Sequence, residues 1–350
     1  MKIHEKYIKR CIELAKKGLG TTYPNPLVGS VIVHKNRIIG EGWHYKAGKP
    51  HAEVNAINAV KDKTLLKEAT IYVSLEPCSH FGKTPPCSDL IIKHGIKNVV
   101  IGTVDPFSKV AGKGIKKLKE AKSNVTVGVL EEACNELNKR FFTYHIQKRP
   151  YIILKWAQSA DGFLSPYEIQ NGQKKPKQTW ITNDISKQLV HKWRNEEQAI
   201  LVGTNTVLID NPSLTTREWY GKSPLRVTVD QSRKIPENAR ILNDEAESLI
   251  FTAHKESDAD NLSPMHIPVS FEDGLLDAIM KNLYHKDIQS VIVEGGGFTL
   301  QSFIKNNLWD EARVFIGNKV FKEGIPAPKI TGRLIEKKDL NTDELYIWKR

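Results

Sequence analysis

Short apolar runs rich in β-branched residues alternate with helix-type patterns along this whole chain, for example at 70–75 and 199–202. Such residues favour strands, and strands that alternate with helices pack as a sheet covered by helices. The pattern stops at Gln147-Lys148-Arg149-Pro150 and then starts again. A chain of 350 residues is long for one domain and natural for two. We therefore expect two α/β domains, 1–146 and 147–350.

In the first domain the periodicity predicts five strands and five helices, which indicates a layered α/β fold. The strands are expected at 28–33, 38–40, 70–75, 98–104 and 125–129, and the helices at 4–18, 51–61, 89–94, 113–121 and 131–145. In the second domain strands are expected at 151–155, 199–202, 225–230, 249–252 and 290–293, with helices at 185–195, at 275–283 and through Phe303. Residues 163–178 are polar and contain proline and glycine, so we predict a surface loop there.

Charge and hydropathy narrow the class of protein. The formal net charge is +12, which suits nucleic acid, a membrane surface or a phosphorylated small molecule. The lysines are scattered without interleaved aromatics, so we expect an anionic small substrate and no nucleic acid. No segment reaches the roughly 18 uncharged apolar residues of a membrane span, and the N-terminal segment has no apolar signal region. We therefore expect a cytoplasmic protein without a membrane partner.

His51, Cys78 and Cys87 are the candidate metal ligands. His51 starts a predicted helix, Cys78 follows a proline after a predicted strand, and Cys87 follows two prolines in a Gly/Pro-rich loop. One imidazole and two thiolates give the ligand count of a catalytic zinc site with its fourth position open to water. The alternative is a helix-capping histidine with two buried cysteines. Cys11 and Cys134 lie among apolar neighbours in helical patterns, and we expect them to be structural thiols.

Glu53 lies two residues after His51 in the same predicted helix. Residues two apart do not share a helix face, so Glu53 is not expected to be a further ligand. It can instead stand over the metal-bound water, whose pKa zinc lowers to about 7. Attack of this activated water on an amidine carbon, while a glutamate passes protons to the leaving amine, is the mechanism of zinc deaminases. The sequence thus predicts one zinc per chain, with Glu53 as the catalytic proton shuttle.

The H-A-E and P-C motifs around these ligands resemble the cytidine-deaminase superfamily, which implies a three-layer α/β/α fold for the first domain. Eight residues separate Cys78 from Cys87, where polynucleotide and cytidine deaminases usually have two. The segment LEPCSHFGKTPPC, with TTYPNPLVG at 21–29 and GEGWHYKAGKPHAE at 40–53, resembles the bifunctional riboflavin-biosynthesis deaminase–reductase family. The resemblance spans nearly the whole chain. It implies deamination of 2,5-diamino-6-(5-phosphoribosylamino)pyrimidin-4(3H)-one, then NADPH-dependent reduction of the ribosyl group to ribityl.

The same resemblance implies four deaminase substrate contacts. An amide would meet a pyrimidine edge, and imidazole or ammonium donors would meet ring oxygens or phosphate; these residues are Asn25, His44, His80 and Lys83. Without the family, each is equally well a polar loop residue. One motif differs from the family, because its typical D-P-N-P reads Asp105-Pro106-Phe107-Ser108 here. We therefore expect no polar contact from Phe107.

A glycine-rich turn marks the second domain. The predicted strand ending at Val293 runs into Glu294 and Gly295-Gly296-Gly297, and a predicted helix follows. Glycines at such a turn let backbone N–H groups approach a phosphate at the helix N-terminus. Leu300 takes the place of the last glycine of G-x-G-x-x-G, so a standard Rossmann fingerprint is absent. A tight turn without a ligand is the alternative for this motif alone.

The family resemblance extends to KWAQSADG at 155–162, TWIT at 179–182 and LVGTNTVLIDNPSLTTR at 201–217. It implies that the second domain is similar to dihydrofolate reductase and binds NADPH. The implied cofactor contacts are Gln158, Trp180, Thr206, Asp210, Gly296, Gly297, Phe298, Thr299, Leu300, Gln301 and Ser302. The implied substrate contacts are Lys155, Gln178, Arg194, Leu214, Arg217 and Glu294.

Two arginines of this set, Arg194 and Arg217, suit a phosphate because a guanidinium pairs with it bidentately. Trp180 as a core aromatic and Arg194 as a solvated helix residue are the structural alternatives. The family's short A-T-x-x-G-E-S stretch before the tryptophan is longer and different here. Gln178 stands where the family commonly has a small hydroxyl residue.

Two other functions remain open from the sequence. The C-terminal half could be a non-catalytic scaffold of a deaminase, in which case it would not bind NADPH. The charge also allows a nucleic-acid-editing deaminase, which would bind single-stranded RNA at physiological salt; the long cysteine spacing and the second domain argue against it. We expect a homo-oligomer that acts on a phosphorylated ribosylaminopyrimidine.

Overall fold

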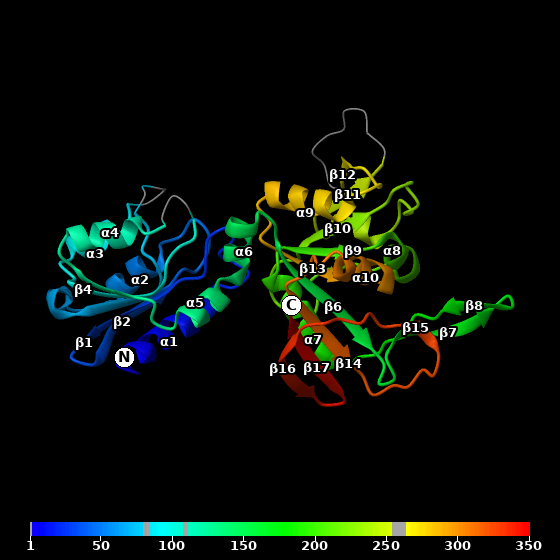
Figure 1. Cartoon of the computed structure of the whole chain (residues 1–350), viewed down its shortest axis with the longest axis horizontal. Coiled ribbons are helices and arrows are strands. Elements are labelled where there is room, and N and C mark those ends of the chain that lie inside the picture. Colours follow the sequence, from blue (N-terminus) through cyan, green and yellow to red (C-terminus); the bar gives the residue numbers. More distant parts are fainter. Residues whose placement is uncertain (1, 80, 82–84, 108–110, 254–263) are drawn as a thin grey trace. The chain divides into compact units, whose positions relative to one another are not determined.

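The computed structural model describes residues 2–79, 81, 85–107, 111–253 and 264–350. The chain divides into two compact units, Met1–Lys148 and Arg149–Arg350 (Figure 1). No described helix combines the length and the apolar character needed to cross a membrane. Each unit is described separately below.

The N-terminal unit contains a five-stranded sheet in the order β2-β1-β3-β4-β5. Its strands are β1 (Gly29–His34), β2 (Arg37–Trp43), β3 (Thr70–Leu75), β4 (Asn98–Thr103) and β5 (Asn124–Val127). Its helices are α1 (Lys2–Lys16), α2 (Ala52–Ala59), α3 (Cys87–Lys93), α4 (Lys113–Glu120), α5 (Glu131–Leu137) and α6 (Lys139–Gln147), with a 3₁₀ helix at Lys63–Glu68. One closing helix was expected at 131–145, but the chain breaks at Asn138 into α5 and α6.

Side chains alternate along the strands of this sheet and pack into two separate hydrophobic cores, one on each face. Val31 packs with α1 and α5 on one face, whereas Ile32 packs with α2, α3 and α4 on the other. Tyr72 and Val73 of β3 divide between the two faces in the same way. Figure 1 shows the sheet between these two groups of helices. The expected three-layer α/β/α arrangement is therefore confirmed.

Helix α2 packs unusually close to strand β2. A Cβ atom at Gly42 would lie 2.6 Å from the backbone nitrogen of Ala56, and one at Gly40 would overlap the carbonyl oxygen of Ala56. The Asn55 side chain also donates a hydrogen bond to the Trp43 carbonyl, at 2.8 Å. These glycines thus determine where α2 begins, and with it the position of His51.

The C-terminal unit contains a nine-stranded sheet in the order β12-β11-β10-β9-β13-β6-β14-β17-β16. These strands are β6 (Tyr151–Gln158), β9 (Ala199–Val202), β10 (Leu225–Val229), β11 (Ser248–Thr252), β12 (Met265–Pro268), β13 (Ser290–Glu294), β14 (Glu311–Ile316), β16 (Arg333–Leu340) and β17 (Asp343–Lys349). Its helices are α7 (Asp184–Glu196), α8 (Thr204–Asp210), α9 (Leu275–His285) and α10 (Gly297–Lys305), with a 3₁₀ helix at Arg240–Leu242. The strands from β12 to β14 are parallel, and β17 and β16 are antiparallel.

This larger sheet also separates two cores. Leu201 packs toward α9 and α10, whereas Ile200 and Val202 pack toward α7 and α8. The strands near the middle of the sheet are buried on both faces, as parallel strands covered by helices are. Helix α8 and strands β12, β14, β16 and β17 were not expected from the sequence.

The predicted surface loop at 163–178 is wrong. This segment forms the antiparallel strands β7 (Phe163–Gln170) and β8 (Gln173–Pro176), and β15 (Gly324–Pro326) joins them in a second sheet. The turn consists of Asn171 and Gly172, with φ angles of 51° and 73°. Asn-Gly is the strongest short hairpin signal, because both residues tolerate positive φ. Figure 1 shows β7 and β8 extending away from the nine-stranded sheet.

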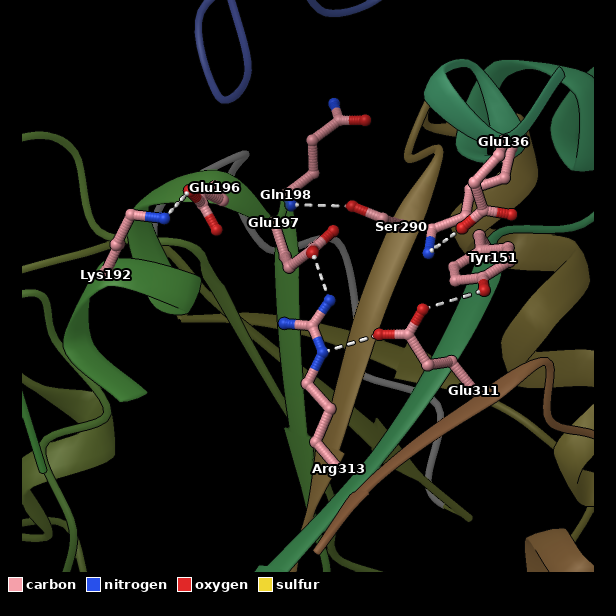
Figure 2. Close-up of polar contacts among 10 residues, drawn as sticks. Glu136, Tyr151, Lys192, Glu196, Glu197, Gln198, Ser290, Glu311 and Arg313 are labelled. Atoms are coloured by element: carbon pink, nitrogen blue, oxygen red, sulfur yellow. Dashed lines mark hydrogen bonds and ion pairs between the residues drawn. The ribbon is translucent and has the colours of Figure 1, made fainter. Parts of the chain in front are cut away.

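A buried polar network lies at the amino ends of the parallel strands. The Arg313 guanidinium donates to Glu311, at 2.6 Å, and to Glu197, at 3.4 Å, and the Tyr151 hydroxyl donates to Glu311 at 3.1 Å (Figure 2). Tyr151 and Glu311 begin β6 and β14, which are neighbours in the sheet. Paired buried charges of this kind hold neighbouring strands in register, and no sequence pattern predicted them.

Candidate functional site

The N-terminal unit brings His51, Cys78 and Cys87 together. Their potential ligand atoms all lie within 4.8 Å of one another. The Nδ1 atom of His51 is 3.6 Å from the Cys78 sulfur and 3.4 Å from the Cys87 sulfur. His51 caps the start of α2, Cys87 is the first residue of α3, and Cys78 lies in the segment after β3. Two helix starts and one strand end therefore build this cluster.

The electrostatics of the cluster favour a bound cation. A hydrogen bond from Cys87 lowers the pKa of Cys78 to about 4, and the same interaction raises the pKa of Cys87 well above its ordinary value. The hydrogen bond to Cys78 also raises the pKa of His51. One thiolate thus opposes ionisation of the other, and a divalent cation would hold both as thiolates. An imidazole with two thiolates fits zinc.

Glu53 lies next to this cluster without belonging to it. Among the described residues the metal-binding group contains the imidazole and the two thiols only. Glu53 is 3% exposed, and burial raises its pKa to about 7, with the nearby Cys78 charge adding to the effect. A buried carboxyl beside a metal cluster has the position of a proton shuttle.

Asn25 and His44 meet beside the cluster. The His44 ring lies 5.4 Å from the His51 ring, nearly perpendicular to it. Because the Nδ1 atom of His44 is 3.1 Å from the Pro50 carbonyl, that nitrogen carries the proton. The Nε2 atom then accepts a hydrogen bond from the Asn25 amide, at 3.0 Å. This arrangement fixes the Asn25 amide orientation and leaves its carbonyl oxygen for another donor. The predicted contacts His80 and Lys83 lie outside the described residues.

Phe107 makes an aromatic contact in place of the family's polar one. Its ring lies 4.8 Å from the ring of His145 on α6, which in turn packs against Phe141 at 4.3 Å. The Phe107 backbone N–H donates to the Asp105 carboxylate at 2.8 Å. The segment after β4 is therefore attached to α6 by ring packing.

In the C-terminal unit Glu294 joins two predicted substrate contacts. Its carboxylate pairs with Lys155 at 2.5 Å and with Arg194 at 3.0 Å. Burial alone would raise the pKa of Glu294, but the two cations outweigh it and lower the pKa to about 2. Arg194 also donates to the Thr215 carbonyl at 3.2 Å. Both terminal nitrogens of Arg194 are thus engaged by the protein.

Arg217 and Leu214 occupy opposite environments in the segment after α8. The Arg217 side chain is 48% exposed, and its nearest acidic partner is Glu218, at 3.8 Å. Leu214 is buried in the core with a positive φ of 57°, which is strained for a leucine. A substrate contact at Leu214 would have to come from its backbone. Of the two arginines predicted to bind a phosphate, Arg217 is the more exposed, whereas Arg194 is engaged by Glu294 and the Thr215 carbonyl.

The conformation and packing of the turn at 295–297 do not require glycine. None of Gly295, Gly296 and Gly297 has a positive φ. A Cβ atom on any of them would meet only ordinary contacts, at 3.4 Å or more. The Gly296 N–H donates to the Thr206 hydroxyl at 3.0 Å, so two predicted cofactor residues meet here. Open space above backbone at a helix N-terminus is what a phosphate-bearing ligand requires.

The other predicted cofactor contacts differ in exposure. Trp180 is 64% exposed, with the Lys187 ammonium 5.5 Å from its ring, so it is no core aromatic. Phe298 is also exposed, whereas Leu300 is fully buried in the core. Gln158, Thr299, Gln301 and Ser302 are half-buried, and Gln178 and Asp210 are exposed. The side chain of Leu300 therefore has no surface to offer a cofactor.

Comparison with known proteins identifies a family domain in each unit. Residues 1–103 match the cytidine and deoxycytidylate deaminase zinc-binding region, and residues 150–332 match the RibD C-terminal domain. A riboflavin biosynthesis protein RibD of Aquifex aeolicus is 44% identical over 95% of this chain and 92% of its own. The chain belongs to the RibD family. It is a deaminase–reductase of riboflavin biosynthesis.

Other RibD proteins agree with this assignment. RibD of Escherichia coli is 34% identical over 90% of this chain and 88% of its own. A Thermotoga maritima structure is described as a diaminohydroxyphosphoribosylaminopyrimidine deaminase/5-amino-6-(5-phosphoribosylamino)uracil reductase. It is 37% identical, covers 99% of both chains and superposes with a TM-score of 0.86. Family membership confirms the expected fold class, a cytidine-deaminase-like unit followed by a dihydrofolate-reductase-like unit.

His191 is a residue of the reductase region that the sequence analysis missed. It lies on α7, one turn before Arg194, and is 2% exposed. Burial and the nearby Arg194 and Arg217 lower its pKa to about 4. A histidine at i and an arginine at i+3 on one helix face was the only available sequence signal.

The lowered pKa of His191 predicts an acid-sensitive C-terminal unit. Unfolded histidine binds its proton near pH 6.5 and the folded residue only near pH 4, so between these values acid favours unfolding. The full shift corresponds to roughly 3 kcal/mol. Denaturant unfolding should therefore show wild-type stability falling between pH 6.5 and 4, and His191→Gln should reduce that slope.

Tryptophan fluorescence suits this measurement, because six of the seven tryptophans belong to the C-terminal unit: Trp156, Trp180, Trp193, Trp219, Trp309 and Trp348. Equal pH slopes for the wild type and His191→Gln would contradict the prediction.

Proposed function

We propose that the N-terminal unit hydrolyses the amino group of 2,5-diamino-6-(5-phosphoribosylamino)pyrimidin-4(3H)-one and that the C-terminal unit then reduces the ribosyl group with NADPH. The observation that carries this proposal is the convergence of His51, Cys78 and Cys87 beside the buried Glu53. Membership of the RibD family supplies the substrate class.

His51, Cys78 and Cys87 would hold one zinc ion. When bound, the metal makes water a nucleophile at neutral pH. Glu53 takes the proton of that water and passes it to the leaving nitrogen, so that a C–N bond breaks, a C=O bond forms and ammonia leaves. Burial of Glu53 excludes bulk water that would otherwise exchange this proton.

Asn25 and His44 orient the pyrimidine. The His44 tautomer, set by the Pro50 carbonyl, makes its Nε2 atom an acceptor, so the Asn25 carbonyl oxygen remains to accept from a ring N–H or an amino group. A pyrimidine edge bound by this pair would lie beside the metal cluster. His80 and Lys83 stay proposed contacts on the basis of the family alone.

The C-terminal unit binds NADPH over Gly295-Gly296-Gly297 and Thr206. NADPH supplies the hydride that converts the ribosyl group to ribityl. Glu294 ends β13 and lies in register with Lys155 of the adjacent strand β6, so an ammonium and a carboxylate would face the ribose hydroxyls together. Arg217 binds the substrate phosphate, whereas Arg194 holds Glu294 and the Thr215 carbonyl in place.

The first test of this proposal replaces Glu53 with glutamine. The amide is nearly isosteric but cannot carry the proton, so deamination should fall by ~10²–10⁴-fold. Both products are followed with the ribosylaminopyrimidine phosphate, with and without NADPH. The variant should keep its zinc and still reduce the deaminated substrate. Near-normal deamination by zinc-loaded Glu53→Gln would refute the role of Glu53.

The second test concerns the glycine turn. Because the protein leaves room for a Cβ at Gly296, Gly296→Ala and Gly296→Val should fold with wild-type stability. Their side chains occupy the space of the cofactor phosphates, so the Kd for NADPH should rise by about tenfold or more for valine and less for alanine. Titration by NADPH fluorescence measures this series. If the wild type binds no NADPH, the C-terminal unit is a scaffold.

The third test concerns Arg217. Arg217→Ala removes a charge-assisted hydrogen bond worth about 1.5–3 kcal/mol, which corresponds to a roughly 10- to 100-fold rise in the apparent KM of reduction. The kcat and NADPH binding should change little. Lys222→Ala is the matched control, because it removes a positive charge from the same exposed segment. An equal KM effect in both variants would show that only the general charge matters.

A further inference from the structure

Glu76 is a buried carboxylate whose hydrogen-bond partners, among the residues that the structure describes, are backbone N–H groups. It lies one residue after β3 and is 4% exposed. One of its oxygens accepts from Asp105, at 3.3 Å, and Gly112, at 2.9 Å. The other accepts from Gly114, at 2.9 Å, and Ile115, at 3.1 Å. Four charge-assisted hydrogen bonds thus end on one side chain.

These donors belong to two elements, the segment after β4 and the start of α4. Asp105 follows β4, and Gly114 and Ile115 form the first turn of α4. The N-cap of α4 is Gly112, with a φ of 78° and no side chain to cap the helix. The open N–H groups of α4 are therefore satisfied by a residue far away in the sequence.

The same junction touches the segment that carries Cys78. A Cβ atom at Gly114 would overlap the Pro77 carbonyl oxygen, so the first turn of α4 lies directly against the Pro77 peptide. The Glu76 backbone N–H also donates to the Thr103 carbonyl at 2.9 Å. Residues 76 and 77 are thus held by β4 and α4 immediately before the cysteine. On the other side, Cys78 receives the Cys87 N–H on its sulfur, at 3.3 Å.

We propose that Glu76 is a positioning residue for the metal cluster: by binding the end of β4 and the start of α4, its carboxylate fixes the backbone that presents the Cys78 thiolate. This inference rests on the proposed zinc site. It extends that site by a residue that touches neither metal nor substrate. Residues that orient ligands in this way typically change metal affinity roughly 10- to 100-fold when they are replaced.

The test uses full-length protein loaded with cobalt(II) in place of zinc, because its thiolate charge-transfer absorption reports the geometry of Cys78 and Cys87. Glu76→Gln keeps one acceptor oxygen but turns an NH₂ group toward two N–H donors. We expect a shifted charge-transfer band and a roughly 10- to 100-fold faster loss of cobalt to a chelator. Glu120→Gln, at the exposed end of the same helix, is the matched control and should match the wild type in both. NADPH-dependent reduction by the same samples checks the other unit.

Gly114→Ala is the second variant, because it displaces the Pro77 peptide while keeping the carboxylate. It should change the charge-transfer band and the rate of cobalt loss in the same direction as Glu76→Gln. If Glu76→Gln does not fold, Gly114→Ala alone tests whether the junction between α4 and the Pro77 peptide positions Cys78. If a folded variant shows the wild-type charge-transfer band and the wild-type rate of cobalt loss, the positioning role of Glu76 is wrong, even if the melting temperature is lower. The proposed zinc site would still stand. A wild-type protein that binds neither cobalt nor zinc would instead overturn the proposed function, and this inference with it.

Discussion

Parallel pairing of neighbouring strands is the constraint on which both sites depend. In the N-terminal unit β3 and β4 are parallel, so Cys78 and Asp105 emerge at the same edge of the sheet. In the C-terminal unit β9, β13 and β6 are adjacent and parallel, so Glu294 at the end of β13 lies in register with Lys155 of β6. Helix α8, which carries Thr206, follows β9, and the Thr206 hydroxyl accepts from Gly296 just after β13. Ligands of α/β sheets bind outside the carboxyl ends of strands for this reason. Tyr151 and Glu311, the first residues of β6 and β14, belong instead to the buried network that Arg313 joins, and this network pairs charges between the strands.

Glycine serves two different purposes in this chain. At Gly42 the neighbouring helix leaves no space for a side chain, and the close packing places His51 and Glu53. At Gly296 the protein leaves the space open, and its φ of −61° suits any residue. A glycine that the protein itself does not require is best explained by a ligand that approaches the backbone. The sequence shows a glycine in both places, and only the structure separates the two reasons.

The grouping of His51, Cys78 and Cys87 could be predicted from the sequence, because the H-A-E and P-C motifs and the strand ends are local signals. It missed what depends on distant partners. The strands at 163–178 are polar because their outer faces meet water, and the Asn171-Gly172 turn was the signal left unused. Arg194 looked like a phosphate ligand, yet Glu294, 100 residues away, engages it. Glu76 carries no signal in the sequence, because its partners in the described part of the chain are backbone N–H groups.

The charges around Glu294 leave a net positive charge in the C-terminal unit. Lys155 and Arg194 share the single carboxylate of Glu294, so a positive charge remains after the buried pairing is complete. Arg217 adds a half-exposed guanidinium. It lies two residues after Thr215, whose carbonyl accepts a hydrogen bond from Arg194. Burial lowers the pKa of His191 to about 4, and the nearby Arg194 and Arg217 add to this effect, although Glu218 and Glu294 act in the opposite direction. In the function that we propose, the substrate phosphate would pair with the half-exposed Arg217 and would balance the positive charge that remains beside Glu294.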